Sequence, residues 1–252
     1  QETIDTCNQI LTTDSNSIQA IKLIAKSFLS INRIEDARLY LNKVLNINPD
    51  DYEVIKDLGN TYSAIGDLNA AKTCFQKAIA INPSYAPALT NLGVLEFRKS
   101  NKIEGLSLLI KATESDPQLD PAWSNLANVY LTLKKIKEAE SSIKKAIELN
   151  PSRFNYHFFL ATTLVSQKKL QEAEQSLRKT IELKPDFADA HFYLGAVLKD
   201  LGKRQEAEAC IRKSIKLNPH FFNSHFLLAS ILIEQKKLQE AEQSLRKTIE
   251  LK

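Results

Sequence analysis

Six prolines recur along the chain at a constant spacing of 34 residues. They are Pro49, Pro83, Pro117, Pro151, Pro185 and Pro219. A fixed period of this length indicates a chain built from one small structural element copied along an axis, in which each copy packs only against its neighbours. Such a chain has no separate globular core, and it usually presents an extended surface on which a partner binds.

The apolar residues of one 34-residue repeat predict two short helices. In residues 52–85, Ile55, Leu58 and Tyr62 are spaced by three and four residues, which places them on one face of a helix. The same kind of spacing returns later in the repeat, at Ala71 and Phe75. A glycine followed by an aspartate separates the two sets, as expected where one helix ends and the next begins. Each recurring proline then follows the second helix, which it cannot continue.

Small residues occupy two fixed positions in every repeat. We number each repeat from its first residue, so that the recurring proline is at position 32. Position 8 holds Ala25, Gly59, Gly93, Ala127, Ala161, Gly195 and Ala229. Position 20 holds Ala37, Ala71, Gly105, Ala139, Ala173, Ala207 and Ala241. Because these side chains are so small, the two helices of a repeat can approach each other closely at these points.

Seven repeats in register with this pattern resemble the tetratricopeptide repeat (TPR) family, as a bacterial-type tandem array similar to the superhelix of O-linked N-acetylglucosamine transferases. The resemblance implies an all-α fold, a right-handed α-solenoid of about seven helix–turn–helix repeats. We expect a single domain over residues 1–252, in which residues 1–17 form the second helix of a partial preceding repeat. The repeats are expected at residues 18–51, 52–85, 86–119, 120–153, 154–187, 188–221 and 222–252.

One residue departs from the pattern. Position 11 is apolar or aromatic in the other repeats but is Glu96 in the third. Burial of an unpaired carboxylate is costly. We therefore expect Glu96 either to pair with Arg98 or Lys99, which are close in sequence, or to face water.

The resemblance also implies which surface binds partners. In this family the first helices line the concave side, through positions 2, 5, 6, 9, 12 and 13. In repeats two to four this surface is polar, and its candidate peptide-binding residues are Lys56, Asn60, Asn91, Asn125 and Asn128. Asn91 and Asn125 resemble the asparagine ladder of the transferases, whose amides hold the main chain of a peptide by offering both a donor and an acceptor. Alternatively, these side chains only keep the surface solvated.

A second resemblance is partial. Lys56, Asn60 and Asn91 stand where the first three residues of the carboxylate clamp stand in chaperone-binding TPR proteins. The two remaining basic positions of that clamp are Pro121 and Asn125 here. Charge-assisted contacts contribute much of the affinity for a C-terminal carboxylate. With two of them missing, we do not expect this chain to bind C-terminal chaperone tails.

Aromatic residues dominate the first helices of the last three repeats. Position 5 is Phe158, Phe192 and Phe226. If these rings are exposed on the concave surface, they form an apolar patch that favours an apolar peptide or a helix as ligand. Alternatively, the rings pack between neighbouring first helices and are mostly buried. The sequence leaves both interpretations open.

Three histidines recur at position 4 of the last three repeats, His157, His191 and His225. Neighbouring helices pack ~8–10 Å apart, whereas the ligands of one metal ion must lie within roughly 3–4 Å of each other. Position 4 holds bulky side chains in the other repeats. We therefore expect a structural role for these histidines and no metal site.

Composition excludes several other classes of function. The net charge is +4, from 34 basic and 30 acidic residues that are mixed along the chain, so we expect no nucleic-acid partner. No apolar run reaches the ~18 residues of a membrane span, and no secretory signal is visible. Three cysteines far apart in sequence favour a reducing compartment, so we expect cytoplasmic localisation. Phosphate-binding glycine loops, paired zinc-binding histidines and nucleophile elbows are lacking, so we expect no catalytic residues, no cofactor and no enzymatic activity.

The function predicted from the sequence is a non-catalytic interaction scaffold that binds a peptide or protein segment in the concave groove. One alternative is the substrate-recognition arm of a larger transferase-type enzyme. The other is a self-associating structural array. The chain starts at Gln1, contains no methionine and stops at Lys252, just before the next expected proline. We therefore expect a fragment of a longer array whose uncapped ends can stack end to end.

Overall fold

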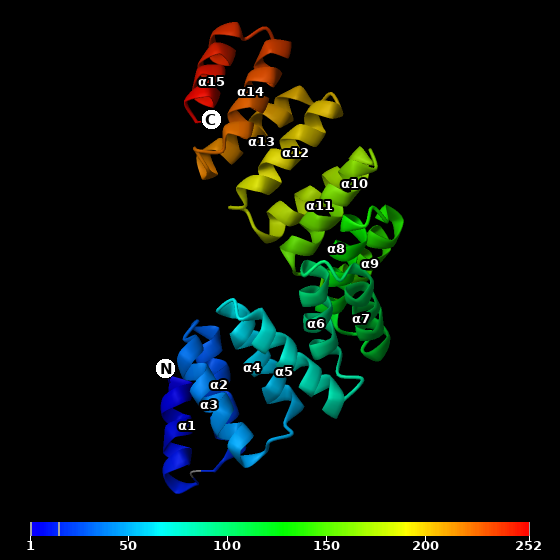
Figure 1. The fold of residues 1–252 in the computed structure, drawn as a ribbon. Coiled ribbons are helices and arrows are strands. Elements are labelled where there is room, and N and C mark those ends of the chain that lie inside the picture. The colour runs from blue at the N-terminus through cyan, green and yellow to red at the C-terminus, as the bar shows by residue number, and fades with distance from the viewer. Residues whose placement is uncertain (1, 15, 252) are drawn as a thin grey trace. The chain divides into compact units, whose positions relative to one another are not determined.

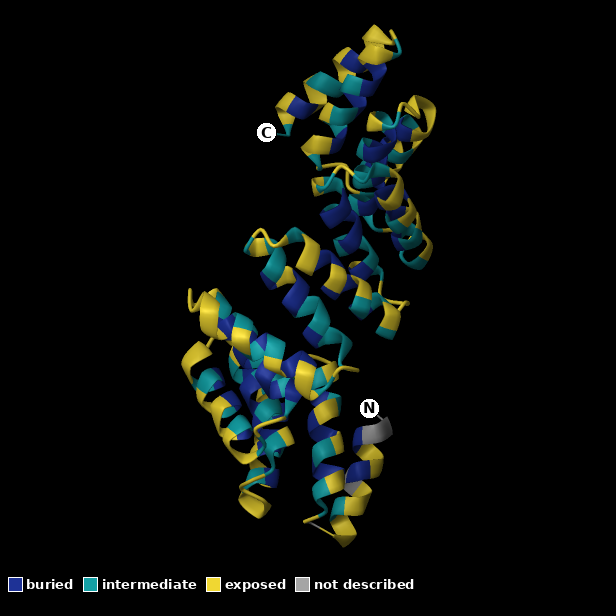
Figure 2. Cartoon of the chain, turned by 90° about the vertical axis from the view of Figure 1, so that its right-hand side faces the viewer, coloured by how far each residue is buried: buried dark blue, intermediate teal, exposed yellow. Residues whose placement is uncertain are grey.

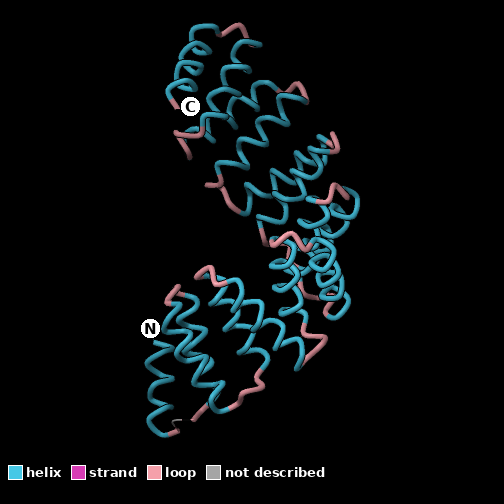
Figure 3. Tube along the Cα trace, in the orientation of Figure 1, coloured by secondary structure: helices cyan, strands magenta, loops and turns pink. Residues whose placement is uncertain are grey.

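The computed structural model describes residues 2–14 and 16–251, which form fifteen helices and no strand (Figure 1 and Figure 3). The helices are α1 (Glu2–Thr13), α2 (Ile18–Ser30), α3 (Ile34–Ile47), α4 (Tyr52–Ala64), α5 (Leu68–Ile81), α6 (Ala86–Arg98), α7 (Lys102–Ser115), α8 (Asp120–Thr132), α9 (Ile136–Leu149), α10 (Phe154–Ser166), α11 (Leu170–Leu183), α12 (Ala188–Asp200), α13 (Arg204–Leu217), α14 (Phe222–Glu234) and α15 (Leu238–Glu250). The prediction of an all-α chain of helix–turn–helix repeats is confirmed. None of the helices described is both long and apolar enough to cross a membrane.

Consecutive helices pack against one another, and the buried residues form stripes along them (Figure 2). The most extensive contacts join the two helices of a repeat: α2 with α3, α4 with α5, α6 with α7, α10 with α11, α12 with α13, and α14 with α15. At the start of the chain, α1 packs on α2, and its Ile4 and Cys7 are buried together with Ile24 and Phe28. The contacts divide the chain into two compact parts, residues 1–126 (the N-terminal part) and residues 127–252 (the C-terminal part).

The two helices of a repeat touch most closely at positions 8 and 20. A Cβ atom added to Gly105 on α7 would lie 2.7 Å from the carbonyl oxygen of Gly93 on α6 and 2.7 Å from the backbone nitrogen of Phe97. Both atoms belong to the backbone, so no side-chain rotation can make room for the extra carbon. Between α4 and α5, a Cβ atom at Gly59 would lie 2.6 Å from the ring of Phe75. The small residues therefore set the distance between paired helices.

The turn between the two helices of each repeat contains one residue with a positive φ angle, at position 15. These residues are Asn32, Gly66, Ser100, Lys134, Lys168, Gly202 and Lys236. The residue that follows donates its backbone N–H to the carbonyl five residues earlier, as from Asp67 to Tyr62 at 2.9 Å. This hydrogen bond closes the C-terminus of the first helix. Glycine adopts the left-handed conformation without strain, but only two of the seven turns have glycine at this position. The sequence therefore indicates the left-handed residue at these two turns only.

In the last four repeats, a hydrogen bond from position 4 holds the preceding proline linker against the first helix. Trp123 Nε1 donates to the carbonyl oxygen of Pro117 at 3.0 Å. His191 Nε2 lies 2.9 Å from the carbonyl oxygen of Pro185, and the other two recurring histidines make the same contact at 2.8 and 2.9 Å. A carbonyl can only accept, so Nε2 is the donor. The histidines thus act as structural links, and within residues 2–14 and 16–251 no group of three His, Cys, Asp or Glu side chains is arranged to hold a metal ion.

Acidic side chains at position 21 link neighbouring repeats of the C-terminal part. Glu140 on α9 accepts hydrogen bonds from Lys144 of its own helix at 2.6 Å and from Gln167 and Lys169 of the next repeat at 2.7 and 2.8 Å. Two later carboxylates make equivalent ion pairs, Glu174 with Arg178 and Lys203, and Glu208 with Arg212 and Lys237. Burial by itself raises the pKa of Glu140, but the hydrogen bonds outweigh this effect and lower its pKa to about 2.

Substitution Gly105→Ala should destabilise the N-terminal part. Alanine has the higher helix propensity by ~1 kcal/mol, but forcing a methyl group against two backbone atoms costs about 1–3 kcal/mol. We expect a lower free energy of unfolding in urea, followed by circular dichroism. Ser107→Ala is the control, because Ser107 is exposed on the same helix. Equal or greater stability of Gly105→Ala would show that the helices are not held at their limit of approach.

The interaction of Glu140 predicts a specific dependence of stability on pH. Its folded pKa of about 2 lies below the ordinary value of 4.5, so its stabilising effect is full above the ordinary pKa and is lost as the pH falls towards 2. Glu140→Gln should therefore lose less stability than the wild type between pH 5.5 and about pH 2.5. Urea titrations at several pH values measure this. Glu148→Gln, at an exposed carboxylate of the same helix, should keep the wild-type profile.

Candidate functional site

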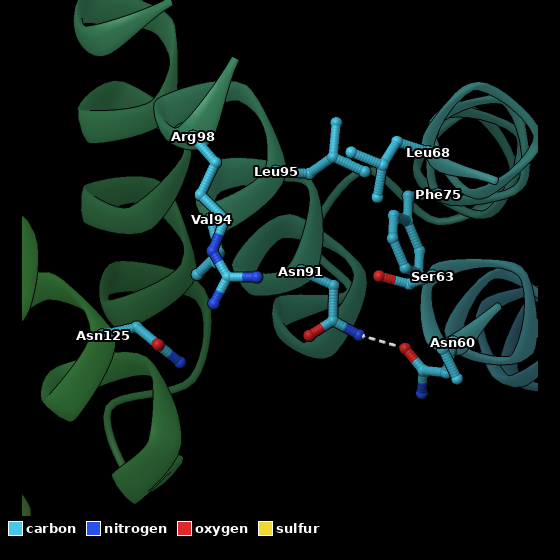
Figure 4. A pocket seen from close by; sticks show the side chains of 10 residues that line it. Asn60, Ser63, Leu68, Phe75, Asn91, Val94, Leu95, Arg98 and Asn125 are labelled. Carbon is cyan, nitrogen blue, oxygen red and sulfur yellow. Dashed lines mark hydrogen bonds between the residues drawn. The ribbon is translucent and has the colours of Figure 1, made fainter. Parts of the chain in front are cut away.

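The N-terminal part contains a groove lined by its first helices α4, α6 and α8 and by the second helix α5, with a volume of about 400 Å³. It is lined by Asn60, Ser63, Ala64, Leu68, Phe75, Asn91, Val94, Leu95, Arg98 and Asn125 (Figure 4). We call it the amide groove, after its three asparagines. The volume falls in the range of ordinary ligand pockets, ~300–1,000 Å³. Apolar side chains and convergent polar groups are both present, which is typical of a binding site.

Helices α4, α6 and α8 each contribute one asparagine to the amide groove. Asn91 Nδ2 donates to Asn60 Oδ1 at 2.7 Å, across the boundary between two repeats. Asn125 Nδ2 donates to the carbonyl oxygen of Pro121 one turn earlier, at 2.9 Å. In the described part of the chain, these bonds leave the Nδ2 group of Asn60 and the Oδ1 atoms of Asn91 and Asn125 without a protein partner. The three amides therefore offer a ligand both unused N–H donors and unused carbonyl acceptors.

The other two polar candidates, Lys56 and Asn128, do not line the amide groove. Lys56 forms an ion pair with the adjacent Asp57, and both side chains are largely buried, so the ammonium group is already neutralised. Lys56 does not line the amide groove. Asn128 is exposed on α8, but it belongs to the C-terminal part and is not among the lining residues. Of the five polar candidates, three come together in one groove.

Sequence reasoning did not identify Arg98 as a binding residue, yet it lines the amide groove from the last turn of α6. It stands at position 13, one of the positions expected on the concave side, so its position in the repeat could have identified it.

The expected pairing of Glu96 with Arg98 or Lys99 is wrong. Glu96 is buried, and its Oε1 atom lies 2.7 Å from Nζ of Lys72 on α5, while Asn101 donates to Oε2 at 2.9 Å.

Hydrogen bonding to Lys72, and then to Asn101, lowers the pKa of Glu96. Glu96 is therefore charged at neutral pH, and its carboxylate is paired with Lys72 of α5 and with Asn101 in the turn after α6. Its partners leave the neighbouring guanidinium group of Arg98 unused.

In the C-terminal part, the aromatic side chains of the first helices form a continuous row. The row runs from Phe154 through Phe187, Phe158, Tyr193 and Phe192 to Phe221, and successive ring centroids in this order are 5.0–5.5 Å apart. Most pairs meet edge to face, a favourable geometry for aromatic rings. Phe158 contacts Phe187 at the end of its own repeat and Tyr193 of the following repeat, whereas Phe192 contacts Tyr193 and Phe221 of its own repeat; both rings are half-buried. Phe226 is 59% exposed and has no ring partner among the described residues.

Comparison with known proteins identifies the fold family. The family model described as the C-terminal domain of cilia and flagella-associated protein 70, a TPR domain, matches residues 51–252. A search of curated proteins finds no match.

Solved structures with the same fold include PilF of Pseudomonas aeruginosa, with a TM-score of 0.76 and 20% identity over 84% of this chain and 97% of that one. YrrB, described as a TPR protein with an unusual peptide-binding site, has a TM-score of 0.61 and 23% identity over 73% of this chain and 95% of that one. A chain of the Cut9–Hcn1 hetero-tetramer has a TM-score of 0.71 and 16% identity over 98% of this chain and 49% of that one. With its helix pairs and its family match over four fifths of its length, the chain belongs to the family of TPR domains named after the C-terminal domain of cilia and flagella-associated protein 70.

Proposed function

We propose that this chain is a non-catalytic interaction scaffold and that it binds an extended peptide segment of a partner protein in the amide groove. The observation that most supports this is the set of three asparagines on successive first helices, two of them joined by the hydrogen bond from Asn91 to Asn60. Their remaining amide groups are free to pair with the main chain of a ligand.

Amide side chains suit an extended main chain for a chemical reason. A peptide in extended conformation presents a donor and an acceptor at every residue, with a rise of about 3.3 Å per residue. Side-chain amides match these groups whatever the sequence of the peptide. Asn91 is anchored by Asn60, and Asn125 by its own helix, so neither needs to be ordered when a ligand binds. Preorganisation of this kind lowers the entropic cost of binding.

The apolar lining supplies the second component of affinity. Leu68, Phe75, Val94 and Leu95 line the groove beside the asparagines. Phe75 and Leu95 are buried, so the apolar surface open to a ligand is that of Leu68 and Val94, and covering it with an apolar residue of the peptide favours binding. YrrB has the same fold and is described as having a peptide-binding site, which supports this role at the level of the fold.

The aromatic residues of the C-terminal part are proposed to provide a further, apolar binding surface. The ring of Phe158 stabilises the contact with the next repeat and that of Phe192 packs on Tyr193 and Phe221, and the exposed edges of both offer apolar surface to a ligand. Phe226, 59% exposed on α14, is the most accessible of the three. An apolar peptide side chain or helix face is the ligand that such a surface favours.

The two alternative roles place different demands on the chain. As a substrate-recognition arm, it would use the same amide groove to present a peptide to a catalytic domain elsewhere in a longer protein. Self-association would instead use exposed apolar side chains of the last helix, such as Leu238 and Ile249, which are 66% and 77% exposed. We rank peptide binding first because the amide groove combines free hydrogen-bonding groups with an apolar lining.

The asparagines give a direct test of the amide groove. Peptides that bind the chain can be selected from a library of random nonapeptides, acetylated at the N-terminus and amidated at the C-terminus, and their affinity measured by fluorescence anisotropy. Asn91→Ala with Asn125→Ala should weaken binding by about 1–3 kcal/mol for each site lost. Asn46→Ala is the matched control, because Asn46 is exposed on α3 and lies outside the groove. Unchanged affinity of the double variant would refute the proposal.

A comparison of alanine variants at Phe192 and Phe226 should show which of the two rings packs within the fold and which is available to a ligand. Phe192→Ala removes the ring contacts with Tyr193 and with Phe221, which directly precedes α14, and should destabilise the C-terminal part by roughly 2–4 kcal/mol. Phe226→Ala, at an exposed site, should change stability by less than about 0.5 kcal/mol. Urea denaturation of both variants measures the difference. Equal loss of stability in the two variants would show that Phe226 packs as tightly as its counterpart and is not available to a ligand.

A further inference from the structure

Arg98 is a free cation inside the amide groove. Its side chain extends from the last turn of α6 and places the guanidinium group between Asn91 and Asn125 (Figure 4). Within the described residues it has neither a carboxylate partner nor a hydrogen bond. A guanidinium group is charged at every physiological pH, so this is a permanent unpaired positive charge.

The other basic side chains around the groove are already in use. Lys72 pairs with the buried Glu96 at 2.7 Å, and Lys56 pairs with Asp57. Lys99, which follows Arg98 in sequence, donates to Oδ1 of Asn69 at 2.8 Å. Of Lys56, Lys72, Arg98 and Lys99, only Arg98 therefore keeps its positive charge available to a ligand.

The lining of the amide groove contains no carboxylate. Its ten residues comprise three asparagines, one serine, five apolar residues and Arg98, so the charge of the lining is that of Arg98 alone. A groove with one unpaired guanidinium and no acidic group favours an anionic ligand group by charge complementarity. The planar guanidinium forms bidentate hydrogen bonds with a carboxylate, which adds geometric selectivity to the attraction.

We propose that Arg98 sets the specificity of the amide groove by binding the side-chain carboxylate of an aspartate or glutamate in the peptide. This inference rests on the proposed function and names the ligand class of the same site. In an extended peptide, successive side chains point to opposite faces. With the main chain held by Asn91 on one side and Asn125 on the other, a side chain that points inwards between them meets the guanidinium. An internal residue fits this place better than a chain end, because asparagines suited to the main chain lie on both sides of Arg98.

The same nonapeptide library tests this inference. Peptides selected by the wild-type chain should be enriched in aspartate or glutamate at one internal position. Replacing that residue by glutamine or asparagine should weaken binding about tenfold to a hundredfold, the usual value of a charge-assisted hydrogen bond. Arg98→Gln should bind the acidic and the amide peptide equally, whereas Arg98→Lys, which keeps the charge without the planar fork, should retain part of the preference. Raising the salt concentration should reduce the preference in the wild type.

Arg246→Gln is the matched control, because Arg246 is an exposed arginine on α15 that pairs with Glu242, far along the sequence from the groove. This variant should keep the full preference. Selection without enrichment of acidic residues, or an acidic preference that survives in Arg98→Gln, would overturn the inference. So would a preference for a free C-terminus over an internal acidic residue, tested with the same peptides lacking the C-terminal amide.

The outcomes distinguish the inference from the function on which it rests. Binding that depends on Asn91 and Asn125 but shows no acidic preference refutes the role of Arg98 and leaves the amide groove in place. Binding that is indifferent to both asparagines, or no binding of any peptide, refutes the proposed function and the inference together. Circular dichroism of each variant confirms that the helices are intact before affinities are compared.

Discussion

The close approach of two helices at positions 8 and 20 is the constraint on which the rest of the structure depends. At Gly93 and Gly105 the helices are so near that a methyl group would meet backbone atoms. This contact fixes the geometry of each hairpin, and the hairpin in turn fixes which side chains of the first helix remain free to face a ligand. A groove made of residues from three successive first helices, as Asn60, Asn91 and Asn125 are, requires that every hairpin keeps the same spacing.

Periodicity made much of this fold predictable from the sequence. A feature that returns every 34 residues provides several independent observations of the same structural position. The helix pairs, the small residues at their contact and the structural role of the recurring histidines could therefore all be inferred. The turns show the limit of this reasoning. Glycine marks the left-handed residue at Gly66 and Gly202, but lysine occupies the same conformation at Lys134, because the hydrogen bond that closes each helix favours it whatever the side chain.

The candidate site was less predictable, because side-chain partners do not follow the period. Position within the repeat brought Asn60, Asn91 and Asn125 to one surface, but no pattern indicates that the amide of Asn91 turns towards Asn60. The prediction for Glu96 fails for a similar reason. Sequence proximity favours Arg98 and Lys99 as its partners, whereas the packing of α5 against α6 places Lys72, 24 residues earlier, 2.7 Å from its carboxylate.

The pairing of Glu96 with Lys72 explains why the groove keeps the positive charge of Arg98. A buried carboxylate must be paired, and any basic group that pairs with it is lost to ligand binding. Because Lys72 neutralises Glu96 from α5, the guanidinium of Arg98, two residues further along α6, stays free at the surface. Neutral amides bind the main chain of many peptides alike, so they supply affinity without much selectivity. A single unpaired cation among them discriminates between ligands of similar shape, because only an acidic side chain gains from meeting it.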